Sequence, residues 1–426
     1  MVNRRHLLML GALGAAAPLL TACGGGDDVD DGTGNATLNF AFWGNDDRAN
    51  KYKQAIDLFQ TQNPTIKVQT SFAAWDVYWQ QRSTEAASSS LPDVVQMDLA
   101  YLAKYARTNQ LLKLDEHLTG DLNVSGIDQS ILPAGKYEDG TFAIPTGTNA
   151  FTLNYNAALL KELGVAEPKS PMTWAQYQQL IKDASAKGAG KSPKVFGSGD
   201  YTGVFWIFLH YLRQQGKEPF SGNKLNFTEA DLTAWWESTT PMRASELIPA
   251  KDVVALKPVS PFAKSLTASE FTWDNQIAGI IGDSGGKGEF KQLTLPTDTS
   301  TSGLFYKASM LLSVSQNTKF PKQSLKLIDF LINSPEAGKI FGTSKGLPVT
   351  KAQRDAIEQA GTDAAVLAYE ESIKSSVGAS QGALPEGFGT IETDFLNISE
   401  EINYGKATPA DAAKRWFANA ADALEQ

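Results

Sequence analysis

The sequence predicts an α/β protein that is divided into two lobes. The chain has 426 residues, and a chain of this length usually divides its core between two domains. Over residues 37–108, short runs of β-branched and aromatic residues alternate with longer stretches that repeat apolar residues at helical spacing. Strands that alternate with helices in this way are typical of an open sheet with helices packed on its faces.

The composition and the charge exclude several classes of function. Hydrophobic residues make up 42% and charged residues 20% of the chain, as in soluble globular proteins. The formal net charge of −9 argues against nucleic-acid binding, which needs a basic face. A single cysteine excludes an intramolecular disulfide, and three histidines leave little room for zinc or for histidine-based catalysis. We therefore expect neither a metal nor a cofactor.

Residues 1–22 are predicted to be a signal peptide. Arg4 and Arg5 precede an apolar run at residues 7–20, which is too short to span a bilayer; a buried N-terminal helix is the alternative. The run ends in LTAC, which resembles the lipobox of bacterial lipoproteins, and its Cys23 is the only cysteine in the chain. Residues 23–36 are rich in Gly and Asp and read as a flexible tether. We expect lipid attachment at Cys23, after export by either the Sec or the twin-arginine route, and a protein held outside the cytoplasmic membrane.

The first lobe is expected to begin with three strands and three helices. Ligands of open α/β sheets bind beyond the carboxyl ends of the strands, and this rule singles out Trp43, Asp46, Asp98 and, one turn further, Tyr101. The alternative role for Trp43 is a core aromatic, and for Asp98 a helix N-cap, which is compatible with binding. The expected strands are 37–43, 66–72 and 93–98, and the expected helices run from an Asp46 or Asp47 cap to Asn63, from 75 to 90 and from 99 to 108.

Residues 137–156, YEDGTFAIPTGTNAFTLNYN, allow two interpretations. A turn signal at residues 138–140 is followed by the apolar residues 142–144, which Pro145 is expected to stop, and by a second alternating run at residues 151–155. This pattern fits a hairpin within one domain. It also fits a crossing from one lobe to the other that lines a ligand cleft.

The second lobe is expected to carry several helices with clear start signals. Thr173 and Gln176 form a capping box for a helix that runs to about residue 186, and Thr228 caps another. Tyr201 and Trp206 lie where a Gly-rich loop meets a helix at residues 205–211, so they are either ligand platforms or core residues. Residues 157–163 are expected to be a short helix, and residues 277–281 a strand that runs into a Gly-rich turn.

The segment GDSGG at residues 282–286 is identical to the nucleophile segment of chymotrypsin-like proteases. Those enzymes also need a histidine and an aspartate earlier in the chain. The available histidines, His117 and His210, lie in LDEHLTG and inside an apolar helix, and we interpret them as a surface residue and a core residue. A glycosidase carboxylate pair has no fixed spacing in sequence, so an exported carbohydrate-active enzyme stays an alternative function.

An ordered set of short motifs resembles extracellular solute-binding protein family 1, the sugar-binding lipoproteins of bacterial ABC importers. These motifs cover residues 20–418 and include LTAC, AFWG, AIDLFQTQNPTIKV, PDVVQMD, LLKLDEHL, YEDGTFAIP, LNYNAALLKELGV, TWAQY, IAGIIGD, SLKLIDFLINSPEAGKIF, GLPV and YGKATPADAAKRW. One departure is Ser284, where members of the family often carry an aromatic residue; that ring is expected to be either missing or supplied by Trp273 or Phe271.

The resemblance implies a two-lobed periplasmic-binding-protein-like fold, with each lobe an open sheet flanked by helices and a hinge of crossing segments. It places the first lobe at residues 37–147 and 308–350 and the second at residues 148–307 and 351–426. It implies a monomer that is not an enzyme and that binds a carbohydrate, expected to be an oligosaccharide, in the cleft. It also implies that the protein delivers this ligand to the permease subunits of an ABC transporter.

A sugar site needs aromatic rings that stack on the sugar's C–H faces and carboxylates or amides that bind its hydroxyls. A binder of another small solute, such as a polyamine paired with an acidic cleft, is the remaining alternative. The candidate ligand-binding residues are Trp43, Asp46, Trp75, Asp98, Tyr101, Asn149, Tyr201, Trp206, Trp273, Asp283 and Tyr306.

Overall fold

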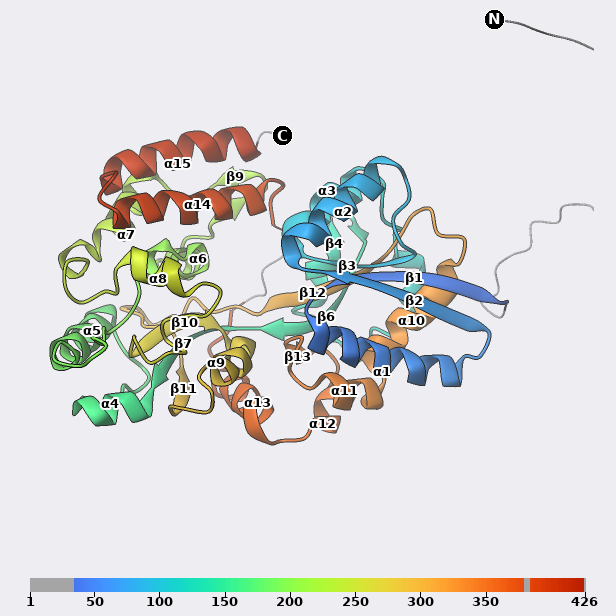
Figure 1. Cartoon of the computed structure of the whole chain (residues 1–426). Helices are drawn as coiled ribbons and strands as arrows, with labels where there is room; N and C mark the ends of the chain where they lie inside the picture. The colour runs from blue at the N-terminus through green and yellow to red at the C-terminus, as the bar shows by residue number, and fades with distance from the viewer. Residues whose placement is uncertain (1–33, 379–383, 425–426) are drawn as a thin grey trace, which may run out of the picture.

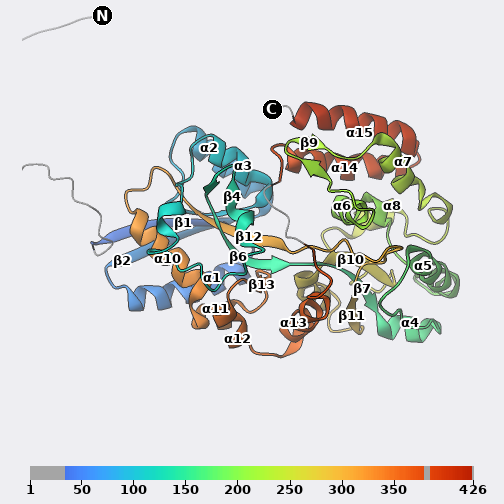
Figure 2. The same cartoon turned by 180° about the vertical axis from the view of Figure 1, so that it is seen from behind.

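The structure, a computed structural model, describes residues 34–378 and 384–424, so Cys23, the predicted signal peptide and most of the predicted tether lie outside the described residues. Figures 1 and 2 show two lobes side by side. The first lobe is built on a six-stranded sheet and the second on a three-stranded sheet. The predicted α/β class with flanking helices is confirmed.

The six-stranded sheet has the order β13-β6-β12-β3-β1-β2. Its three parallel strands come from the predicted alternation, and the helices that follow them cover both faces, with α2 and α3 on one face and α1 on the other (Figure 1). Strands β1 to β3 run toward the second lobe, so their carboxyl ends face it. The bounds are β1 Ala36–Trp43, α1 Asp46–Gln62, β2 Ile66–Ala73, α2 Trp75–Ala87, β3 Val94–Met97 and α3 Leu99–Arg107.

The start of α1 differs from the sequence expectation. The N-cap is Asn45, whose side-chain oxygen accepts a hydrogen bond from the backbone N–H of Arg48, and the expected Asp46 or Asp47 cap is wrong. Both aspartates lie in the first turn of the helix. Carboxylates there interact favourably with the positive end of the helix dipole, which explains why aspartate-rich sequence marks the helix start without supplying the cap itself.

Later segments of the chain complete the first sheet. β12 (Lys307–Val314) lies antiparallel between β3 and β6 (Ile144–Asn149), and β13 (Leu347–Pro348) pairs with the outer side of β6. Pro145 lies inside β6, so the expectation that it ends a strand is wrong. The β6–β12 register shifts beside Leu311, the partner of Pro145, and an irregular pairing accommodates a residue that has no N–H to donate.

Residues 137–156 satisfy both interpretations in turn. β4 (Lys136–Tyr137) and β5 (Gly140–Thr141) form a small antiparallel hairpin. β6 then runs in the first sheet to Asn149, and β7 (Phe151–Asn156) starts in the three-stranded sheet of the second lobe. The chain therefore passes from one sheet to the other across Ala150.

The second lobe packs its helices around the sheet β10-β7-β11. The Thr173 capping box and the Thr228 cap are confirmed, because each side chain accepts the expected backbone N–H. The bounds are α4 Ala157–Leu163, α5 Trp174–Gly188, α6 Phe205–Gln214, α7 Glu229–Glu237, α8 Ala250–Leu256, β10 Ser269–Trp273, α9 Ile277–Asp283, β11 Phe290–Leu293, α13 Gly361–Ile373, α14 Phe388–Asn403 and α15 Pro409–Leu424.

The expected strand at residues 277–281 is wrong, because this segment is helix α9. Ile277 and Ile280 are buried while Gly279 between them is exposed. Burial at i and i+3 is the helical period, and a short apolar run cannot by itself distinguish a helix from a strand.

Three further helices pack together on the face of the first sheet that α1 also covers, namely α10 (Pro321–Asn333), α11 (Pro335–Phe341) and α12 (Lys351–Ala356). The first element after them to contact the second lobe is α13, which packs against α9 and β11. Within residues 34–378 and 384–424, no helix is long and apolar enough to cross a membrane.

The two histidines occupy the expected environments. His210 is fully buried, its ring stacks on Phe305 with centroids 4.4 Å apart, and burial lowers its pKa to about 3. His117 is partly exposed and its Nδ1 lies 2.7 Å from Asp121 Oδ2. Neither faces Ser284, whose hydroxyl donates to the backbone carbonyl of Ile281, so these residues do not form a nucleophile–base pair.

Candidate functional site

A cavity of about 420 Å³ lies between the lobes, beyond the carboxyl ends of the parallel strands. It combines residues of α2 and α3 with residues of α6, β10 and α14, and with the first residue of β12. Its lining residues are Trp75, Asp98, Ala100, Tyr101, Trp206, Trp273, Gln276, Lys307, Phe388, Gly389, Glu392 and Thr393. We call this cavity the inter-lobe cleft.

The wall from the first lobe is aromatic. Trp75 begins α2 directly after β2 and is 40% exposed, which is unusual for so large an apolar ring. Tyr101, in the first turn of α3, stacks on the buried ring of Trp79 with centroids 3.7 Å apart. Because Trp79 holds one face of Tyr101, the ring is fixed in position for a ligand.

Asp98 places a carboxylate at the same edge. It is the N-cap of α3, and its Oδ1 accepts a hydrogen bond of 2.9 Å from the backbone N–H of Ala100. Its Oδ2 lies 3.3 Å from Nζ of Lys307. The structural role and the position in the cleft therefore coexist, as the sequence allowed.

The wall from the second lobe carries two indole rings. Trp206, near the start of α6, meets Trp273, the last residue of β10, edge to face with centroids 5.2 Å apart. Trp206 also packs against Phe388 at 5.2 Å. The indole Nε1 of Trp206 donates to Oε1 of Glu392 at 2.7 Å, so ring and carboxyl group hold each other in place.

Among the described residues, two carboxyl groups and one amino group line the cleft, those of Asp98, Glu392 and Lys307. Nζ of Lys307 lies 5.6 Å from the ring centroid of Trp206 and 5.7 Å from that of Trp273, within the range of a cation–π interaction. Glu392 faces the same region. Its burial raises its pKa to about 7, because loss of hydration outweighs the attraction of Lys307, and the nearby charge of Asp98 acts in the same direction as burial.

A wider groove of about 980 Å³ continues from the cleft between α3 and α14. It shares Tyr101 and Thr393 with the cleft, among other lining residues. At its side, Arg107 of α3 donates to both carboxylate oxygens of Glu386, at 2.9 and 2.8 Å. This ion pair joins the two lobes directly.

The structure brings five of the candidate residues together in the cleft, namely Trp75, Asp98, Tyr101, Trp206 and Trp273. Of the two rings expected to replace the aromatic missing at Ser284, Trp273 lies in the cleft and Phe271 is buried in the second lobe. That these residues bind a ligand stays a prediction.

The other six candidates lie elsewhere. Trp43 is buried behind Trp75, edge to face at 5.0 Å. Tyr201 is buried in the core of the second lobe, stacked on Trp174 at 5.5 Å. Asn149 is buried at the end of β6, and Tyr306 lines a separate cavity of about 180 Å³ behind the lobe junction. The two aspartates are exposed at the ends of helices, Asp46 in α1 and Asp283 in α9.

Sequence reasoning missed several cleft residues, among them Lys307, Phe388 and Glu392. Phe388 and Glu392 are spaced i, i+4 on α14, a spacing that marks one helix face but does not say what the face covers. The C-terminal return of the chain to the second lobe brings α14 opposite α3 (Figure 1), and no local pattern indicates that arrangement.

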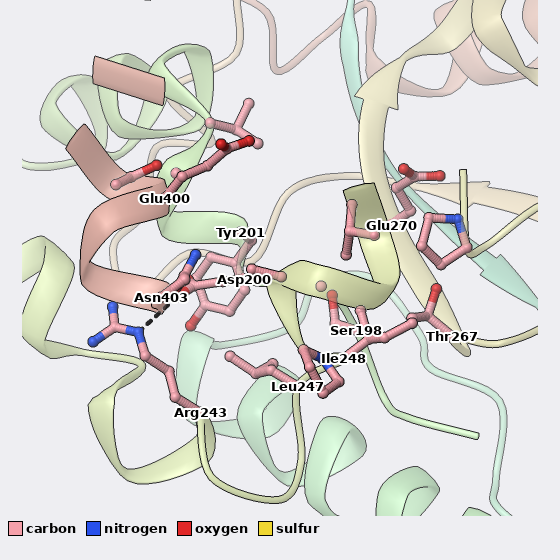
Figure 3. Close-up of a pocket in the computed structure, with 18 of the residues that line it drawn as sticks. Ser198, Asp200, Tyr201, Arg243, Leu247, Ile248, Thr267, Glu270, Glu400 and Asn403 are labelled. Atoms are coloured by element: carbon pink, nitrogen blue, oxygen red, sulfur yellow. Dashed lines mark hydrogen bonds and ion pairs between the residues drawn. The ribbon is translucent and has the colours of Figure 1, made fainter. Parts of the chain in front are cut away.

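A second cavity, of about 240 Å³, lies within the second lobe (Figure 3). Glu270 projects into it, and burial raises the pKa of this carboxyl group to about 7 although Ser260 donates a hydrogen bond to it. Arg243 pairs with Asp200 at 2.7 Å at its edge. All its lining residues belong to one lobe, so a ligand there would not be held between the lobes.

Two buried carboxyl groups meet near the lobe junction. Asp274, just after β10, and Glu370 of α13 are within hydrogen-bonding reach of each other, and Thr148 of β6 donates to Glu370 at 3.3 Å. Burial raises the pKa of Asp274 to about 7. Burial and the charge of Asp274 raise the pKa of Glu370 well above its usual value. The contact links the first sheet to the second lobe through three elements.

Comparison with known proteins gives a consistent result. The model of a family described as bacterial extracellular solute-binding proteins matches residues 54–366. An extracellular solute-binding protein of family 1 from Alicyclobacillus acidocaldarius is 26% identical, with a TM-score of 0.69, and the match covers 92% of this chain and 99% of that one.

Two further solved structures are similar in fold. A Listeria monocytogenes ABC substrate-binding protein in complex with cycloalternan is 18% identical, with a TM-score of 0.78, and the match covers 92% and 99% of the two chains. A periplasmic oligogalacturonide-binding protein from Yersinia enterocolitica, in complex with saturated digalacturonic acid, is 20% identical, with a TM-score of 0.78 and the same coverage of 92% and 99%. All three matches extend over nearly the whole of both chains.

Proposed function

The chain belongs to the bacterial extracellular solute-binding proteins, and on that premise we propose that it captures a carbohydrate in the inter-lobe cleft. We propose further that the carbohydrate is an oligosaccharide and that the protein delivers it to the permease of an ABC importer. Relatives that bind cycloalternan and digalacturonic acid support a sugar ligand. The protein acts as a receptor, and the ligand leaves it chemically unchanged.

The observation that carries this proposal is the pair of aromatic walls on opposite sides of the cleft. Trp75 and Tyr101 belong to the first lobe, and Trp206 and Trp273 belong to the second. Aromatic rings bind the C–H faces of a sugar ring, and the carboxylates and Lys307 between them bind hydroxyls. Since the rings come from both lobes, a sugar in the cleft contacts both at once.

Contact with both lobes makes binding and closure one event. Only the closed form presents both walls to the ligand, so the ligand shifts the population toward it, and the crossing segments absorb the rotation. We propose residues 37–147 with 308–350 and residues 148–307 with 351–426 as the two moving lobes. Micromolar affinity would require about 8 kcal/mol of net binding free energy, which a few stacked rings and several hydrogen bonds can supply.

The wider groove supports a ligand longer than one sugar ring. It continues from the cleft past Tyr101 and Thr393 and opens between α3 and α14. Polar side chains line it, with Asn397 and Asn419 among them. Amide groups of this kind bind sugar hydroxyls as both donors and acceptors.

We also propose that the protein is a monomer attached to the cell membrane through a lipid on Cys23. The lipobox-like LTAC and the single cysteine in the chain support this proposal. Mass spectrometry of the membrane fraction tests it, because a diacylglyceryl group on Cys23 adds a defined mass that a Cys23→Ala variant must lack.

The decisive experiment is a thermal-shift screen of the purified mature protein against mono- and oligosaccharides, with polyamines as controls. We expect an oligosaccharide to raise the Tm by several degrees, and chromatography to recover it intact. If the sugar is cleaved, the protein is an enzyme; if only polyamines shift the Tm, the ligand class is wrong. If nothing in the carbohydrate panel shifts the Tm, the proposed function is refuted.

The screen is then repeated with Trp273→Ala, which removes a ring from the cleft. We expect the sugar-induced shift to disappear while the ligand-free protein stays folded. Tyr404→Ala is the matched control, because Tyr404 is 45% exposed and does not line the cleft. A full ligand shift in the Trp273 variant would show that the binding site lies elsewhere.

A further inference from the structure

Building on the proposed function, we propose that the inter-lobe cleft selects a carbohydrate without negative charge and that Glu392 sets this selection. Relatives of the same fold do accept acidic sugars, as the digalacturonic acid complex shows, so fold alone does not decide the charge of the ligand. The decision lies with the ionisable groups that line the cleft of this chain.

Glu392 is held in a fixed position. It projects from α14 into the cleft, and its Oε1 accepts the hydrogen bond of 2.7 Å from Trp206 Nε1. The side chain is partly buried, so water screens its charge less than it screens that of a fully exposed carboxylate. A ligand that contacts Trp206 in the cleft therefore lies near this carboxyl group.

Within residues 34–378 and 384–424, the cleft offers no unpaired cation to a ligand carboxylate. Among the described residues that line it, the charged ones are Asp98, Lys307 and Glu392. Lys307 is the single cation of this set, and its Nζ already lies 3.3 Å from Asp98 Oδ2 and faces the rings of Trp206 and Trp273. An acidic sugar would therefore meet a net negative or neutral site and would have to compete with Asp98 for Lys307.

The groups around the cleft do not reverse this balance. The wider groove carries Lys104 and Arg107, against the carboxylates of Glu386, Asp394 and Asp422. Arg107 is occupied by its two hydrogen bonds to Glu386. Two cations against three carboxylates leave the groove no more basic than the cleft.

Protonation of Glu392 gives the selection a characteristic pH dependence. Burial raises the pKa of Glu392 to about 7. If an acidic sugar requires the neutral form of Glu392, its affinity follows the protonated fraction, about ten in eleven at pH 6 and about one in eleven at pH 8. The affinity for an acidic sugar should therefore fall by about tenfold from pH 6 to pH 8.

The test compares pairs of ligands that differ in charge and otherwise only in the group at C6. The first pair is the neutral oligosaccharide that gives the largest thermal shift and its counterpart with a uronic acid in place of one hexose. The second pair is digalacturonic acid and its methyl ester. We expect titration calorimetry at pH 8 to show binding of the acid at least about tenfold weaker than that of its neutral partner. The affinity of the neutral ligand should change less between pH 6 and pH 8.

Glu392→Gln keeps the acceptor for Trp206 and removes the charge. We expect this variant to bind the acid about tenfold more tightly than wild type at pH 8 and to lose the pH dependence of that binding. Glu401→Gln is the control, because it removes a carboxylate from the same helix, outside the cleft, where Glu401 pairs with Arg415. An acid that binds wild type at pH 8 as tightly as its neutral partner overturns the proposal.

A measurement without ligand separates this inference from the proposed function. Carboxyl ¹³C NMR of the intact protein, with Glu392→Gln to assign the signal, should give a midpoint near pH 7 for Glu392. A midpoint near the ordinary value for glutamate would leave Glu392 charged at both pH 6 and pH 8, and it overturns the pH dependence of the selection even if sugars bind. Tight binding of uronates alone also overturns it but leaves the receptor function standing, whereas absence of binding to any sugar refutes both.

Discussion

Replacing Asp274 with asparagine tests how the two lobes are joined. Asp274 is fully buried and shares its site with the buried carboxyl group of Glu370. The substitution keeps the shape of the side chain, and its amide oxygen can still accept the 2.8 Å hydrogen bond from the backbone N–H of Asn275. The amide nitrogen can donate to Glu370, which a carboxylate cannot do.

The magnitude follows from the pKa. Burial raises the pKa of Asp274 from 3.8 to about 7, so the folded protein retains a proton that the unfolded chain releases. Stability contributed by this proton is complete below about pH 4 and is lost as the pH rises toward 7. Over the two pH units from 5 to 7 the loss is about 2 kcal/mol, since each unit corresponds to about 1.4 kcal/mol.

The assay is urea denaturation of wild type and Asp274→Asn at pH 5, 6 and 7, followed by tryptophan fluorescence and circular dichroism. Burial also raises the pKa values of Glu270 and Glu392, so these groups make stability fall with rising pH. They do so equally in wild type and in the variant, and their effect cancels in the comparison. The series ends at pH 7 because burial lowers the pKa of Lys345 to about 7. Above that pH the unfolded chain binds this proton more tightly than the folded protein, so Lys345 makes stability rise with pH, opposite to Asp274.

We expect the variant to lose about 2 kcal/mol less than wild type between pH 5 and pH 7, and to be the more stable protein at pH 7. Asp283→Asn is the control, because that carboxylate is exposed at the end of α9, and its pH dependence should match wild type. Equal pH dependence of wild type and Asp274→Asn would show that the charge of Asp274 is compensated in the folded protein, and the reasoning would be wrong.

Three further predictions concern the lobe contact, the first sheet and a helix cap. Arg107→Ala removes the ion pair with Glu386 between the lobes. It should weaken ligand binding by less than about tenfold without lowering the Tm, because exposed ion pairs contribute little. An unchanged affinity in calorimetry would show that the pair does not support closure. Gly346→Ala should lower the free energy of unfolding, measured by urea denaturation, by about 2 kcal/mol or more. The reason is that Gly346 has φ of +89° and a Cβ would lie 2.5 Å from the carbonyl oxygen of Thr148. A loss below about 0.5 kcal/mol, the size of a neutral surface substitution, would contradict this. Thr173→Ala should cost about 1 kcal/mol by removing the capping box of α5, and Thr173→Ser should restore most of it.

The first half of the fold is readable from sequence because its signals are local. Each strand and helix of the alternating region buries residues that recur at its own period, and caps such as Thr173 act on backbone groups a few residues away. Asp98 could be placed for the same reason, since it is at once the end of a strand and the start of a helix. The errors also have local causes. Residues 277–281 are too short to show a period, and Pro145 fits in a strand because its pairing with β12 is irregular there.

The site depends on long-range contacts, so sequence reaches only part of it. Tyr201 and Trp206 lie on either side of a loop–helix boundary and both are buried, yet Tyr201 stacks on Trp174 within the second lobe whereas Trp206 lines the cleft. By itself the sequence determined the α/β class, the capped elements, the family resemblance and the aromatic residues available for a sugar. Only the tertiary structure decided which of them share one cleft, and it alone placed Glu392 beside Trp206 and Lys307 beside Asp98. The physical reason is that a helix or strand is specified by neighbours within a few residues, whereas a cleft between lobes is specified by segments that meet only after the chain has crossed between them.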